Sequence, residues 1–171
     1  SKYELITKNK QLDKWLAKIK KSRVVALDTE TTGLDYMDSR LVGISLSVKP
    51  GEAAYIPLAH SHEEQLPEEH VLKKLKPILE SNKTKVIGQN IKFDKNILSR
   101  YGVELDTIEN DTMLMSYVLN STASRHNMNA LAQYYLNYKT TTFEEVAGKG
   151  VKQITFDQVP LDKALHYASE D

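Results

Sequence analysis

The sequence of 171 residues contains no cysteine, which excludes disulfide bonds and thiolate metal ligands. It lacks any apolar run near the ~20 residues that span a membrane, and its basic start lacks the apolar core of a signal peptide. Neither sign of charge is in excess, because 23 Lys and Arg balance 23 Asp and Glu. No global electrostatic field therefore points to a nucleic acid or a membrane. We expect one cytoplasmic domain spanning residues 1–171.

The residues that are present suffice for a hydrophobic core. Of the chain, 40% is hydrophobic, and a domain near this length buries roughly 68–70% of its unfolded surface. The charge balance is only an average, because eight Lys and Arg lie in residues 1–23 and eight more lie in residues 73–100. Apolar residues in the first stretch recur at helical spacing and predict an amphipathic helix with a solvated, lysine-rich face: Leu12, Trp15, Leu16 and Ile19.

Strand signals dominate the first half of the chain and helix signals the second. Apolar runs and alternating patterns predict strands at 24–27, 42–48, 53–56 and 84–87, the first of them buried on both faces. Helices are predicted after Pro67, Gly88 and Asp111, over 128–135, and from Pro160 to the chain end. Pro77 should kink or divide its helix. This order predicts an α/β class with a mixed sheet flanked by helices.

Two carboxylates follow the first predicted strand. Asp28 and Glu30 are two residues apart, so on an extended chain both point to the same face. At about 4 Å such a pair repels by roughly 4 kcal/mol at an effective dielectric of 20. A cation or a shared proton offsets this cost, and oxygen ligands without cysteine favour Mg²⁺ or Mn²⁺. Alternatively, Asp28 only caps a turn before Gly33.

Two further pairs have helical i, i+4 spacing. Asn90 and Asp94 would share one face of a helix, although Asn90 could simply cap it and Asp94 could interact with its dipole. Tyr167 and Asp171 border the apolar stripe of the last predicted helix and could both face a cleft. Each pair alone is a weak signal, but the three occur in a definite order along the chain.

This ordered set resembles the three motifs of the 3′–5′ exonuclease family that has four acidic residues and a tyrosine, in particular the proofreading domains of bacterial DNA polymerase I. The resemblance covers the chain from end to end and rests on residues 28–34 (DTETTGL), 88–94 (GQNIKFD), 111–114 (DTML), 119–121 (LNS), 142–150 (TFEEVAGKG) and 167–171 (YASED). It implies a ribonuclease H-like fold with a mixed, five-stranded central sheet surrounded by helices.

The resemblance also implies a chemistry, namely two-metal hydrolysis of the 3′ end of single-stranded DNA, releasing nucleoside monophosphates. Asp28 would bridge both ions, Glu30 and Asp171 would complete the site that activates water, and Asp94 would hold the second ion. Tyr167, with an ordinary pKa of about 10, is too weak an acid to serve as a base at neutral pH, so it is assigned to orienting the water. The implied substrate-binding residues are Leu34, Gln89, Asn90, Arg125 and Phe143.

Several alternatives stay open at this point. Leu34 could be a core residue, and Phe143 could pack at a helix start. The substrate could be RNA, as in ribonuclease D-like enzymes, or the chain could be a catalytically weak structural module of a polymerase. His60 and His62 are interpreted as parts of a solvated loop rather than as zinc ligands.

The chain is expected to be a monomeric fragment of a larger polymerase whose polymerase domain follows. In the relatives the last helix continues, whereas here the predicted ligand Asp171 is the final residue. Because helix ends fray, we expect this chain to bind the metal ion at Asp171 weakly.

Overall fold

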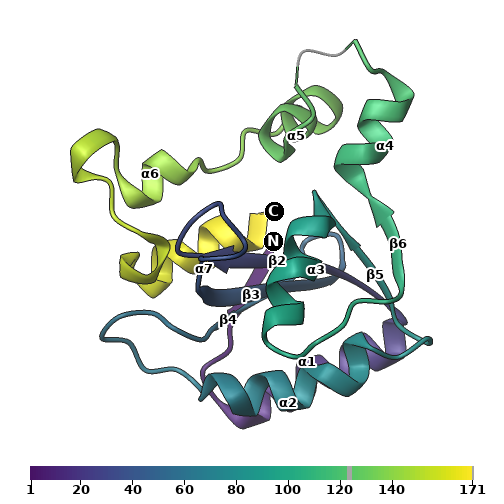
Figure 1. Cartoon of the computed structure of the whole chain (residues 1–171), viewed down its shortest axis with the longest axis vertical. Helices are drawn as coiled ribbons and strands as arrows, with labels where there is room; N and C mark the ends of the chain where they lie inside the picture. The colour runs from purple at the N-terminus through teal and green to yellow at the C-terminus, as the bar shows by residue number, and fades with distance from the viewer. Residues whose placement is uncertain (123–124, 171) are drawn as a thin grey trace.

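The computed structural model describes residues 1–122 and 125–170 (Figure 1). The elements occur in the order β1 (Lys2–Leu5), α1 (Asn9–Ser22), β2 (Val24–Thr31), β3 (Leu41–Lys49), β4 (Glu52–Pro57), α2 (Glu68–Leu79), β5 (Lys85–Gly88), α3 (Ile91–Arg100), β6 (Ile108–Asp111), α4 (Thr112–Leu119), α5 (Met128–Leu136), α6 (Phe143–Ala147), the 3₁₀ turns η1 (Gly150–Lys152) and η2 (Phe156–Gln158), and α7 (Leu161–Glu170). No helix in these residues is long and apolar enough to cross a membrane.

The strands form one mixed sheet in the order β1-β4-β3-β2-β5-β6. Strand β2 pairs antiparallel with β3 and parallel with β5, so the strand that carries Asp28 and Glu30 lies inside the sheet. This confirms the mixed α/β class. The sheet has six strands rather than five, and the strand pattern did not indicate β1 or β6. Both are short, largely polar strands at the edges of the sheet. Each pairs with a neighbour on one side only, and neither has the alternating apolar residues by which inner strands are recognised.

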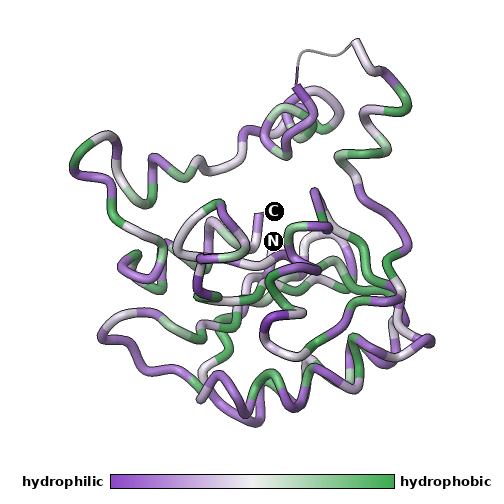
Figure 2. Tube along the Cα trace, viewed as in Figure 1, coloured by the Kyte–Doolittle hydropathy of each residue, from purple (hydrophilic) through white to green (hydrophobic). Residues whose placement is uncertain are grey.

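A hydrophobic core lies on each face of the sheet. The larger one is built from α1, α2, α3 and the strands, and includes the stripe Leu12, Trp15 and Ile19 that the helical spacing predicted. The smaller one joins the sheet to α7, α6 and η2. Figure 2 shows apolar segments along the strands and on α1 and α2, and also along α4, which stands away from the sheet. Helices therefore cover both faces of the sheet, with one hydrophobic core on each side.

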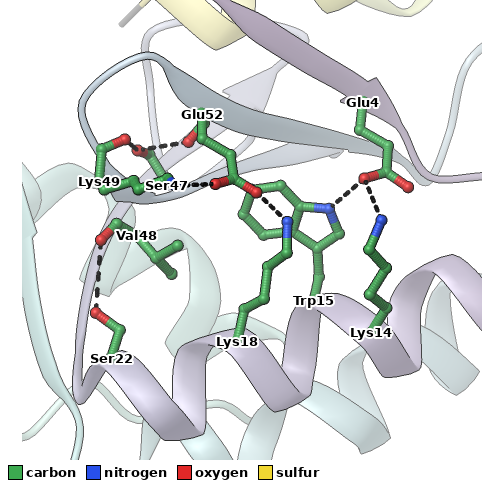
Figure 3. A network of polar contacts seen from close by, with 9 residues as sticks. All are labelled: Glu4, Lys14, Trp15, Lys18, Ser22, Ser47, Val48, Lys49 and Glu52. Carbon is green, nitrogen blue, oxygen red and sulfur yellow. Dashed lines mark hydrogen bonds and ion pairs between the residues drawn. The ribbon is translucent and has the colours of Figure 1, made fainter.

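Ion pairs dock the lysine-rich helix α1 on the sheet edge (Figure 3). Glu4 of β1 accepts a hydrogen bond from the indole Nε1 of Trp15 at 2.9 Å and lies 3.5 Å from Lys14 Nζ. Lys18 pairs with Glu52 of β4, and this hydrogen bond, together with Lys49, lowers the pKa of Glu52 to about 2. The outer face of α1 is therefore not purely solvated, because some of its lysines bind Glu4 of the edge strand β1 and Glu52 of the neighbouring strand β4.

The helix that follows Pro67 continues through Pro77 as far as Leu79, so the expected division does not occur. Pro77 lies in the last turn, where it removes the backbone hydrogen bond to the carbonyl of residue 73 and its ring crowds that carbonyl. Burial of Leu75 and Ile78 on the same helix offsets that loss.

Candidate active site

Strand β2 presents two carboxylates on one face in the middle of the sheet. Asp28 pairs in register with Ser45 of β3, and Glu30 pairs with Gly43. Asp28 lines a cavity of about 110 Å³ together with Gln89, the residue after β5, and Ser169 of α7. Asp28 therefore lies close to α7 in the folded chain.

Asp94 in the first turn of α3 is the third carboxylate brought to β2. Its side chain is 2% exposed. Its Oδ1 accepts hydrogen bonds from the backbone N–H of Thr29 at 2.8 Å and from the Thr29 hydroxyl at 2.6 Å. Burial raises the pKa of Asp94 to about 7, and the Thr29 hydrogen bonds only partly offset this rise. Asp94 therefore contacts the residue between Asp28 and Glu30, although it lies far from them in sequence.

A single carboxylate, that of Asp111, caps both α3 and α4. Asp111 accepts hydrogen bonds from the backbone N–H groups of Asn90 and Ile91, both at 3.0 Å, at the start of α3. It also accepts one from Met113 N–H at 2.9 Å and so caps α4, the helix predicted after Asp111. Asn90 occupies the N-cap position with a left-handed φ of 57°, but its side chain makes no cap hydrogen bond. Asp111 therefore supplies the cap expected from Asn90.

Helix α7 carries Tyr167 on the border of its apolar stripe. Leu161, Ala164 and Ala168 are buried against the sheet, as the spacing predicted. The Tyr167 ring lies 5.6 Å from the ring of Phe156 and 6.3 Å from that of Phe143. Asp171, the other member of the predicted pair, lies outside the described residues.

Phe143 is the first residue of α6 and is fixed there by its neighbours. Thr142 and Glu145 form a capping box that starts the helix. The Phe143 ring stacks on Phe156 at 6.4 Å. The alternative interpretation of Phe143, packing at a helix start, is therefore observed, and this packing brings Phe143 into contact with Tyr167. One predicted substrate-binding residue and one predicted catalytic residue thus share a single aromatic cluster.

The other predicted substrate-binding residues occupy three different surroundings. Leu34 is 96% exposed in the loop after β2, so the alternative of a core residue is wrong. Gln89 donates from Nε2 to the carbonyl of His126 at 2.7 Å and accepts from the hydroxyl of Thr112. Arg125 lines a separate groove of about 240 Å³ between α4 and α5.

His60 is buried, which corrects its interpretation as part of a solvated loop. Its Nδ1 lies 3.0 Å from the carbonyl of Val159 and its Nε2 lies 2.7 Å from the hydroxyl of Tyr55. A carbonyl only accepts, so Nδ1 carries the proton and Nε2 accepts from Tyr55. The ring of Tyr55 passes over Gly43, where an added Cβ would clash with its hydroxyl. Burial, and then the charges of Glu30 and Asp28, raise the pKa of Tyr55.

Glu170, at the end of α7, is an anchoring residue that the sequence did not reveal. Its side chain is 4% exposed and accepts hydrogen bonds from the Tyr138 hydroxyl at 2.6 Å and from Thr141 N–H at 2.7 Å. Burial alone would raise the pKa of Glu170, but these hydrogen bonds outweigh it and leave the pKa lowered. No local pattern indicated this role, because both partners lie about thirty residues earlier in the chain.

The donor set of the site fits a hard divalent cation. Asp28, Glu30 and Asp94 supply only carboxylate oxygens, the ligands that Mg²⁺ and Mn²⁺ prefer. Within residues 1–122 and 125–170, no three Asp, Glu or His side chains stand close enough together to form a complete cage. The fourth predicted ligand, Asp171, is not among these residues.

Comparisons with known proteins identify the family of the chain. A family model described as 3′–5′ exonuclease matches residues 3–171. The chain is 47% identical to DNA polymerase I of Pseudomonas aeruginosa over 174 residues, covering 99% of this chain and 19% of that protein. It is 38% identical to DNA polymerase I of Rhizobium leguminosarum, covering 94% of this chain and 18% of that protein. The chain thus spans about a fifth of the length of these relatives.

Solved structures share the fold at low identity. Brucella melitensis NrnC with bound Mg²⁺ matches with a TM-score of 0.65 and 20% identity, covering 99% of this chain and 72% of that chain. Escherichia coli RNase D, an exoribonuclease, matches with a TM-score of 0.69 and 17% identity, covering 100% of this chain and 41% of that chain. With the family match and the identity to two DNA polymerases I, these findings place the chain in the family of 3′–5′ exonuclease domains.

Proposed function

We propose that this protein removes nucleoside monophosphates from the 3′ end of single-stranded DNA, as the proofreading part of a bacterial DNA polymerase I. The observation that carries the proposal is the contact of Asp94 with Thr29, the residue between Asp28 and Glu30, which fixes a third carboxylate beside β2. The remainder of the polymerase, with its polymerase domain, would belong to the same chain, since the relatives are about five times as long.

The four carboxylates would hold two divalent ions. Asp28 would contact both, Glu30 and Asp171 would complete one position, and Asp94 would complete the other. When bound, the ions would lower the pKa of the attacking water and stabilise the leaving 3′ oxygen. Water would attack the last phosphodiester, the bond from phosphorus to the 3′ oxygen would break, and the shortened strand would keep a 3′ hydroxyl.

The remaining residues orient the reactants. Tyr167 would hold the attacking water with Glu30, since its hydroxyl is too weak an acid to act as a base at neutral pH. Leu34 and Phe143 would contact the terminal bases, because apolar side chains grip bases without reading sequence. Asn90, Gln89 and Arg125 would hold phosphate or sugar oxygens, with Gln89 also fixing the loop at His126.

Degradation of a 3′-labelled single-stranded DNA tests the proposal. Hydrolysis should proceed with Mg²⁺ or Mn²⁺ and stop with EDTA, and Asp28→Ala should lower the rate at least about 100-fold. Asp38→Ala, which removes an exposed carboxylate on the loop after β2, is the matched control and should leave the rate unchanged. Hydrolysis that resists EDTA, or that survives Asp28→Ala, would contradict the metal-centred mechanism.

An RNA strand of the same sequence tests the alternative substrate. Faster hydrolysis of the RNA would favour a ribonuclease D-like activity, since the 2′-OH is the group that distinguishes the two. A catalytically weak structural module is disfavoured, because the sequence retains all four carboxylates and Tyr167.

A further inference from the structure

Helices α4 and α5 form an arm that apolar packing holds only weakly. In α4 the one buried residue is Ser116, and in α5 it is Ala132. Large apolar side chains of the arm remain exposed, with Leu119 at 74% and Leu136 at 75%. Figure 1 shows the arm standing away from the sheet, with α5 above the end of α7. Polar contacts at the two ends of the arm must therefore do much to hold it in place.

Residues 137–142, which connect α5 to α6, are fixed to α7 by Glu170. One oxygen of its carboxylate accepts from the Tyr138 hydroxyl and the other accepts from Thr141 N–H. The Thr141 hydroxyl also lies 3.4 Å from Nδ1 of His166, one turn earlier on α7. Charge-assisted hydrogen bonds of this kind are among the stronger ones, and this carboxylate is nearly fully buried.

This connection leads directly into Phe143. Thr141 is two residues before Phe143, and Thr142 caps the helix that Phe143 begins. The Phe143 ring then packs on Phe156 and Tyr167. Glu170 thus fixes the backbone immediately before Phe143 to the same helix that carries Tyr167. Release of this contact would free both the end of the arm and the start of α6.

We propose that Glu170 is a positioning residue for the 3′ end of the substrate, because its carboxylate holds residues 137–142 on α7 and so sets the place of Phe143 beside Tyr167. Its effect on substrate rests on the proposed function, whereas the contact itself does not. Both carboxylate oxygens of Glu170 are engaged by protein donors, so its role differs from that of the neighbouring proposed ligand.

Limited proteolysis without metal or DNA tests the contact. Lys139 is exposed within the connection, so trypsin cleavage after it reports how often residues 137–142 leave α7. Glu170→Ala loses two hydrogen bonds and should be cleaved about 10–30-fold faster. Glu170→Gln should be cleaved at a rate between those of the wild type and Glu170→Ala, because the amide oxygen still accepts from Thr141 and the amide nitrogen donates to Tyr138, both without the charge. Glu144→Ala removes a half-exposed carboxylate of α6 and is the matched control.

Steady-state kinetics on single-stranded DNA then test the positioning. Glu170→Ala should raise KM about tenfold with kcat within threefold of the wild type, and Glu170→Gln should recover most of this loss in KM. Unchanged cleavage after Lys139 in Glu170→Ala would overturn the proposal. So would an unchanged KM, or a Glu170→Gln variant as defective as Glu170→Ala, which would indicate a metal ligand or a base. If the wild type hydrolyses no DNA, the proposed function fails, while the proteolysis still decides whether Glu170 holds residues 137–142.

Discussion

Replacing Asp94 by asparagine should stabilise the metal-free protein at pH 8 while abolishing hydrolysis. Asp94 is 2% exposed and its pKa rises to about 7 from an ordinary 3.8, because burial disfavours the charged form. The carbonyl oxygen of the substituted amide can still accept both Thr29 hydrogen bonds, so the change removes the charge and keeps the contact. A carboxylate that catalysis requires would thus lower the stability of the folded protein when no cation is bound.

The magnitude follows from the pKa. A rise from 3.8 to about 7 corresponds to at most about 4 kcal/mol of folding free energy above pH 7. The new amide N–H₂ group costs about 1–3 kcal/mol of this if it lacks an acceptor. We therefore expect the free energy of unfolding to rise by about 1–3 kcal/mol at pH 8, or about 2–12 °C in Tm for a chain of this size.

The cost of the buried charge disappears at low pH. The folded-state pKa of Asp94 lies above the unfolded one, so the cost is present above pH 7 and disappears as the pH falls toward 4. Urea unfolding of both proteins in EDTA, at pH 8 and at pH 5, should show the gain at pH 8 only. Added Mn²⁺ should then stabilise the wild type more than the variant.

Asp106→Asn, which neutralises a carboxylate that is 73% exposed, is the control and should change little. Equal stability of Asp94→Asn and wild type at pH 8, or a gain of the same size at pH 5, would refute the reasoning.

Two further predictions concern groups around the site. Asp111→Ala removes the carboxylate that caps both α3 and α4 and should lower the free energy of unfolding by about 2–4 kcal/mol; a loss below about 0.5 kcal/mol in urea unfolding would contradict it. Burial lowers the pKa of His60 from 6.5, so the stability that depends on neutral His60 is present above pH 6.5 and lost below it. His60→Gln should remove that part of the pH dependence between pH 7.5 and 5 in thermal unfolding, and an identical profile would argue against it.

Elements with strong local patterns could be predicted from the sequence. Helix α1 follows from its apolar spacing, and the inner strand β2 from an apolar run without polar alternation. The edge strands β1 and β6 could not be predicted, because their short polar sequences become strands only by pairing with β4 and β5. Helix α2 also contradicts a local rule, since packing of its apolar face outweighs the effect of Pro77.

The site likewise has features that the sequence predicts and features that depend on distant partners. The shared face of Asp28 and Glu30 follows from the period of a strand, and the resemblance of the motifs indicated the remaining candidates. The burial of His60 depends on Val159, 99 residues later, and the anchoring by Glu170 depends on Tyr138, 32 residues earlier. Partners at such separations leave no periodic signal in the sequence.

The sequence by itself determined which chemistry is available, namely carboxylates without cysteine and a tyrosine at helical spacing. Only the tertiary structure placed Asp94 on Thr29, 65 residues away, and buried it there. The physical reason is that strand and helix periods decide which face a side chain takes. Desolvation and hydrogen bonding depend instead on the neighbours that the folded sheet supplies.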